Sequence, residues 1–108
     1  MGHLRSFVAG AVFCFVPACL SAQQLGDPIR GLAFAREVCA ACHAVEHRQP
    51  ASPDPHAPRF DAIASTNGMT AMALYAFLQT PHSTMPNLIL TPDETANLIA
   101  YILSLKER

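Results

Sequence analysis

Cys39-Ala40-Ala41-Cys42-His43 is the stretch of this sequence that decides the fold. Its C-x-x-C-H form is typical of the site at which a c-type haem is attached to a polypeptide. Two thiols three positions apart, followed directly by a histidine, share one face of a helix and can serve one macrocycle. The motif therefore predicts covalent bonds from Cys39 and Cys42 to a haem, with His43 as a ligand of its iron.

Two other kinds of site also use a C-x-x-C pair. A redox dithiol of the thioredoxin kind needs a strand before the motif and a βαβ unit around it, and the sequence pattern contains neither. Half of a zinc site needs a second pair of ligands, for which the candidates are His47 and His56 on a proline-rich loop. Neither alternative explains the histidine that follows the second cysteine.

The chain has 108 residues, enough for one small domain. Residues 1–22 have the features of a secretory signal peptide: a polar start, an apolar run from 7 to 16, and small residues ending at Ala22. We expect cleavage after Ala22, a folded domain over 23–108, and export to the bacterial periplasm. Two alternatives remain: the apolar run is kept as an anchor, or Cys19 is acylated as in a lipoprotein.

The charge and size of the mature chain limit its function. It would carry six Lys and Arg against eight Asp and Glu, a formal balance of −2, so nucleic acid is not an expected partner. A domain this small, with no tryptophan, has a thin core that a buried haem would complete. The chain without haem is therefore predicted to be largely unfolded.

The first helix is predicted to begin at Asp27 and Pro28 and to lead directly into Cys39. Asp27 is a suitable N-cap, and proline at the first helical position loses no hydrogen bond. Gly31 lies inside this helix at a cost of about 1 kcal/mol relative to alanine. This glycine is either simply tolerated or marks a place where another helix crosses closely, and we favour the close crossing.

Two further helices and a loop complete the predicted elements. Four prolines between 50 and 58 predict a loop over 44–68, with a short helical turn at 60–64. A helix capped by Thr70 should run to about Gln79 and bury one wide apolar face that includes Met72. Thr91 and Glu94 form a capping box for the last helix. Since no strand pattern competes, the prediction is an all-α domain.

A second candidate ligand lies between the last two helices. Two prolines bracket a short extended segment, and Pro86 biases Met85 away from helical dihedral angles. A thioether held on a rigid loop can be aimed at a metal, so we predict that Met85 is the second axial ligand of the iron. His82 is the rival ligand, and Met69 is expected to be a core residue.

The order of these features resembles that of the small monohaem class I cytochromes c of the bacterial periplasm. The resemblance spans nearly all of the mature chain, from the haem motif through Met85-Pro86 to the last helix at 100–105. It implies a class I cytochrome c fold, in which three to four short helices surround one covalently bound haem c. It also implies that Gly31 packs against Tyr101.

The resemblance implies a further role for Pro58, whose carbonyl should accept a hydrogen bond from His43 and so orient the imidazole. One feature departs from the family pattern. The large side chain often found four residues before the first cysteine is Ala35 here, with Phe34 one place earlier. This departure concerns the detailed contact between the first and last helices rather than the haem motif.

The expected function is one-electron transport by a haem iron ligated by His43 and Met85. With both axial positions filled, no substrate chemistry is expected at the iron, so the protein is not predicted to be an enzyme. Redox proteins that dock briefly are the expected partners, and no stable membrane insertion is expected after signal cleavage. The alternatives are a haem subunit of a larger oxidoreductase and a ligand-sensing haem protein in which Met85 leaves the iron.

Overall fold

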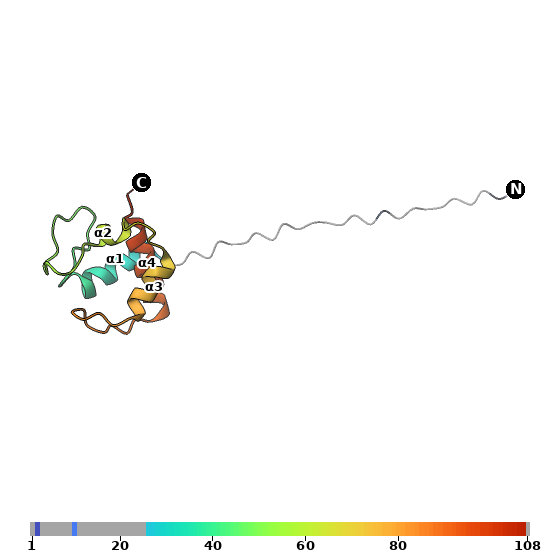
Figure 1. Ribbon diagram of the computed structural model, residues 1–108. Helices are drawn as coiled ribbons and strands as arrows, with labels where there is room; N and C mark the ends of the chain where they lie inside the picture. The colour runs from blue at the N-terminus through green and yellow to red at the C-terminus, as the bar shows by residue number, and fades with distance from the viewer. Residues whose placement is uncertain (1, 3–9, 11–25, 108) are drawn as a thin grey trace.

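The computed structural model describes residues 2, 10 and 26–107 (Figure 1). Within 26–107 every regular element is helical, which confirms the all-α prediction. The elements are α1 (Pro28–Phe34), the π-helical turn η1 (Ala35–Cys39), α2 (Phe60–Ala64), α3 (Ala71–Gln79) and α4 (Pro92–Ser104). In this part of the chain no helix has the length and apolar character needed to cross a membrane. The predicted signal peptide, apart from residues 2 and 10, lies outside the described residues.

Each of the three longer helical segments begins where its capping residues predict. The Asp27 carboxylate accepts a hydrogen bond from the amide two residues on, at 2.9 Å, and Pro28 opens α1. The Thr70 hydroxyl accepts from the amide three residues on, at 3.1 Å. At α4, the Thr91 hydroxyl accepts from the Glu94 amide at 3.2 Å, while the Glu94 carboxylate accepts from the Thr91 amide at 2.8 Å. The predicted capping box is therefore present.

Helices α1 and α4 cross at Gly31, which is buried (Figure 1). A Cβ atom on Gly31 would lie 2.7 Å from the Cβ of Tyr101 and would overlap the backbone carbonyl group of Asn97. Tyr101 is itself fixed, because its hydroxyl donates a hydrogen bond to the carbonyl oxygen of Val45. The predicted contact between Gly31 and Tyr101 is confirmed.

Ala35, where the sequence departs from the family pattern, packs as a small buried residue. Ala35 is fully buried at the start of η1, where its small side chain fits against the core. Phe34, one residue earlier, is partly buried and packs against the same core. The crossing of α1 and α4 therefore forms without a large side chain at position 35.

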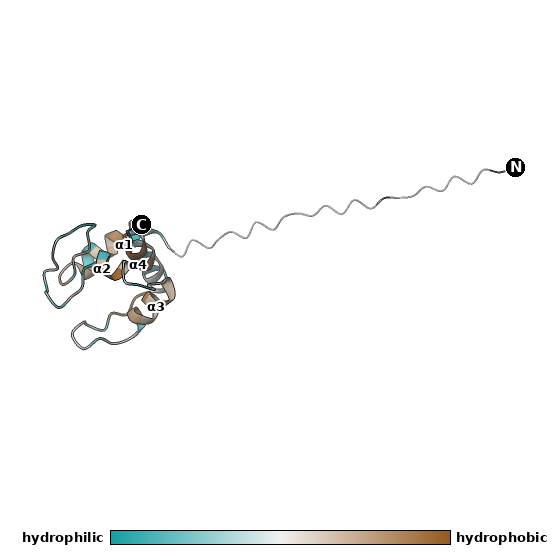
Figure 2. Cartoon of the chain, turned by 45° about the horizontal axis from the view of Figure 1, so that its top comes forward, coloured by the Kyte–Doolittle hydropathy of each residue, from teal (hydrophilic) through white to brown (hydrophobic). Residues whose placement is uncertain are grey.

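Helix α4 supplies more of the buried core than any other helix of the described residues, through Leu98, Ile99, Tyr101 and Ile102 (Figure 2). The prediction of one wide buried face on α3 is wrong: of its nine residues only Leu74 is buried. Met72, Tyr75 and Phe77 expose 81%, 54% and 56% of their surface. Because nearly every residue of α3 is apolar, its sequence does not indicate which side packs against α4.

Candidate functional site

The turn that carries the C-x-x-C-H motif begins with η1. In this π-helical turn the Ala40 amide donates to the carbonyl of Ala35, five residues back, at 2.9 Å. The amides of Cys42 and His43 then both donate to the carbonyl oxygen of Cys39, at 3.2 and 2.9 Å. Single π-helical turns are rare and occur often at functional sites. Here the turn winds the backbone so that both sulfurs and the imidazole border one cavity.

His43 is oriented by a hydrogen bond to a residue of the proline-rich loop. Its Nδ1 lies 2.7 Å from the carbonyl oxygen of Pro58, and because a carbonyl can only accept, Nδ1 carries the proton. The ring also packs against Phe60, with ring centroids 5.3 Å apart and planes tilted by 50°. The Phe60 amide donates to the Ala44 carbonyl at 2.9 Å, which holds the loop beside the motif. This arrangement leaves Nε2 free to bind a metal ion.

One cavity of about 670 Å³ is bordered by every predicted site residue, namely Cys39, Cys42, His43, Pro58 and Met85. The loop before α2 and the loop after α3 reach out on the same side of the molecule and supply two of its walls (Figure 1). Its volume lies within the range of about 300–1,000 Å³ typical of small-molecule and cofactor sites. Most of the lining is apolar and includes Phe60, Leu74, Leu78, Leu98 and Ile102.

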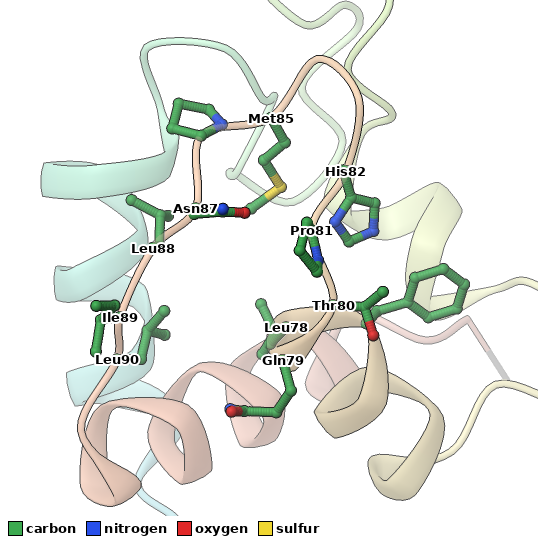
Figure 3. A pocket seen from close by; sticks show the side chains of 12 residues that line it. Leu78, Gln79, Thr80, Pro81, His82, Met85, Asn87, Leu88, Ile89 and Leu90 are labelled. Atoms are coloured by element: carbon green, nitrogen blue, oxygen red, sulfur yellow. The ribbon is translucent and has the colours of Figure 1, made fainter.

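Met85 lies on the loop between α3 and α4, half-buried, with its sulfur directed inward (Figure 3). The same loop encloses a smaller hollow of about 310 Å³, which Met85, His82 and Asn87 also line. His82 stacks on Phe77, with ring centroids 5.7 Å apart and planes inclined by 23°. Sequence reasoning missed Phe77 as a residue of this site, because the stack depends on how the chain turns after α3.

The cavity holds little charge. Of the described residues that line it, only Asp54 is an aspartate, glutamate, lysine or arginine. The His56 amide donates to the Asp54 carboxylate at 2.9 Å, and this hydrogen bond lowers the pKa of Asp54. The wall is mostly apolar and carries two thiols, three imidazoles and two thioethers. It fits a haem, which is mostly apolar and needs thiols for attachment and an imidazole or a thioether for ligation.

The structure disfavours a redox dithiol. Burial raises the pKa of the Cys39 thiol to about 11. A reactive dithiol requires the opposite, since the thiolate is the nucleophile and its pKa is lowered by nearby positive charge or a helix N-terminus. Cys39 therefore stays protonated at neutral pH in this environment.

The structure also disfavours a zinc site. In the part of the chain that the structure describes, no three His, Cys, Asp or Glu side chains come close enough to hold a metal ion together. His47 is exposed and does not line the cavity. His56 lines it, but its side chain is 85% exposed and its Nδ1 faces the Asp54 carboxylate at 3.3 Å.

Comparisons with known proteins found one matching family and one relative that matches nearly the whole chain. The family model described as cytochrome c matches residues 29–106. Cytochrome c-552 of Bradyrhizobium diazoefficiens is 34% identical over 108 residues, which covers 96% of this chain and 96% of the relative. No solved structure matches the chain significantly.

Proposed function

The chain belongs to the cytochrome c family, and from this premise we propose that it is a periplasmic one-electron carrier with His/Met-ligated iron. The family implies a covalently bound haem c and an electron-carrying role in a class I fold. When bound, the haem supplies one-electron exchange between ferrous and ferric iron. In our proposal Cys39 and Cys42 hold it through thioether bonds, while His43 and Met85 are the axial ligands.

The observation that carries the proposal is the hydrogen bond from His43 Nδ1 to the Pro58 carbonyl. A histidine that binds a metal through one ring nitrogen commonly donates from the other, which fixes its tautomer and orientation. With Nδ1 protonated, Nε2 on the other edge of the ring has a free lone pair that can bind a metal. The carbonyl also makes the imidazole a stronger donor, and so contributes to setting the reduction potential.

Met85 determines whether the protein carries electrons or binds substrates. A methionine ligand opposite a histidine raises the reduction potential relative to two imidazoles. With both His43 and Met85 bound to it, the haem iron would have no position left for a substrate. The role of the chain is then to hold the two ligands, exclude water from an apolar cavity and dock briefly with redox proteins.

Ligation by Met85 can be tested by spectroscopy. The ferric protein should show the weak absorption band near the red end of the visible spectrum that reports sulfur ligation, and Met85→Ala should abolish it. Met69→Leu is the matched control, because Met69 is a half-buried methionine that lines the same cavity. A band that survives in Met85→Ala and disappears in Met69→Leu would show that the wrong methionine was chosen.

Attachment and export can be measured on one sample. A pyridine haemochrome assay and the intact mass of the exported protein should show one haem on a chain that begins at residue 23. The double substitution of both motif cysteines by serine should remove the added mass. A matured protein with the mass of its amino acids alone would refute haem attachment, and a retained or acylated N-terminus would refute cleavage after Ala22.

A further inference from the structure

The loop that carries Met85 is held by few directional contacts. Residues 81–90 make no hydrogen bond with any other described residue. The last bonds before this stretch are both donated by Thr80, from its amide to the Phe77 carbonyl at 3.2 Å and from its hydroxyl to the Ala76 carbonyl at 2.6 Å. The next bond belongs to the capping box of α4. Segments with few hydrogen bonds open at a low free-energy cost compared with helices. Side-chain packing and any bond from Met85 must therefore hold this loop in place.

His82 lies on this same loop, three residues before Met85. It is half-buried rather than solvated, and it lines both the large cavity and the smaller hollow beneath the loop. Figure 3 shows the Met85 sulfur inside the curve of the loop and the His82 imidazole beside the chain next to Pro81, while both residues line the large cavity. Stacking on Phe77 supports the ring from one side. The loop thus presents two groups that bind haem iron, a thioether and an imidazole, to one cavity.

Other donors that line the cavity are placed less well for this position. His56 belongs to the loop that contains Pro58, the partner of His43, and is largely exposed. Met69 packs against the hydrophobic core. His82 shares with Met85 a short segment without hydrogen bonds, so a small movement of that segment exchanges one group for the other.

We propose that His82 is an alternative to Met85 as the iron ligand on this loop, and that it binds the iron when the Met85 thioether leaves it. The inference rests on the proposed His/Met ligation. In the exchange the bond from iron to Met85 Sδ breaks, and the lone pair of an unprotonated ring nitrogen of His82 forms the new bond. No electron is transferred. Because two imidazoles give a lower potential than His/Met, the same loop provides a high-potential and a low-potential state.

Carbon monoxide binding to the ferrous haem protein tests the proposal. Met85→Ala should lose the sulfur band yet remain six-coordinate, whereas Met85→Ala with His82→Ala should bind carbon monoxide freely. If His82 fills the position in at least nine molecules of ten, the apparent affinity of Met85→Ala is at least about tenfold weaker than that of the double variant. Met85→Ala with His56→Ala is the matched control and should behave like Met85→Ala.

Equal carbon monoxide affinities for Met85→Ala and its His82→Ala double variant would overturn the proposal, as would a gain of affinity from the His56 control.

If Met85→Ala does not mature, the comparison is made on folded wild-type and His82→Ala proteins treated with hydrogen peroxide. Peroxide transfers one oxygen atom to the methionine sulfur and leaves as water. The same tenfold contrast is expected, and its absence overturns the proposal. A wild-type protein without the sulfur band would instead refute Met85 ligation itself, and with it the basis of this exchange.

Discussion

Replacing Gly31 by alanine should destabilise the folded haem protein, although alanine is the better helix former. Alanine gains about 1 kcal/mol over glycine inside a helix. Against this, the new methyl group would lie 2.6 Å from the carbonyl carbon of Asn97 and 2.7 Å from the Cβ of Tyr101, where ordinary contacts are 3.4–4 Å. Neither atom can swing aside, since one is backbone and the other is bonded to it. Helices α1 and α4 must therefore separate by roughly 1 Å.

The size of the effect follows from these contacts. Inserting a methyl group into a packed interface costs about 1–3 kcal/mol, and the rigid surroundings favour the upper end. The separation also strains the hydrogen bond from the Asp27 amide to the Asn97 side chain, now 2.7 Å, and the bond from Tyr101 to Val45. Each is worth about 1 kcal/mol. After the gain in helix propensity we expect a net loss of about 2–4 kcal/mol.

Guanidinium unfolding of the matured proteins, followed by far-UV circular dichroism, measures this loss. In a thermal melt followed by the same signal, the melting temperature of a domain of this size should fall by at least about 8 °C. Ala33→Gly is the matched control, because Ala33 is an exposed residue of the same helix and reports propensity alone, about 1 kcal/mol. A Gly31→Ala protein as stable as the wild type, beside a control that loses its expected amount, would refute the close crossing.

Three further predictions concern the stability of the folded domain. Tyr101→Phe should lower the free energy of unfolding by about 1–3 kcal/mol, because it leaves the Val45 carbonyl without its donor. Burial raises the pKa of Tyr101, so the folded state holds its proton more tightly and stability should fall as pH rises above about 10. That alkaline loss should shrink in Tyr101→Phe. A chain with both motif cysteines changed to serine, and so without haem, should lack a native far-UV spectrum and a cooperative transition; a cooperative melt would contradict the coupling of folding to cofactor binding.

Local signals predicted the helices well. Caps and prolines act within three or four residues, so Asp27, Thr70 and Thr91 start their helices as their side chains require. The crossing at Gly31 could also be anticipated, because a glycine kept inside a helix and an aromatic residue on the last helix occupy matching places in the family pattern. Each of these inferences depends on a short-range requirement or on a family resemblance. None of them requires knowledge of how the whole chain packs.

Predictions failed where the outcome depends on which side of an element meets the rest of the chain. Met72 was expected in the core, yet it is 81% exposed, because α3 is apolar on nearly all sides and packs through Leu74. The stack of His82 on Phe77 depends on the path of the chain after α3. The π-helical turn was not predicted either, since residues 35–39 form ordinary helical sequence.

The spacing of the haem motif is necessary for His43 to bind iron, but it does not by itself fix the orientation of the imidazole. The turn at Cys39 is local: two amides donate to one carbonyl, and both cysteines and His43 follow from that winding. The orientation of the imidazole is not local, because Pro58 lies fifteen residues away and reaches His43 through the loop that Phe60 ties to Ala44. A chain with the motif and a misplaced proline loop could attach haem and still hold its histidine loosely. The reduction potential should therefore respond to changes in the loop over 44–59 that leave the motif untouched.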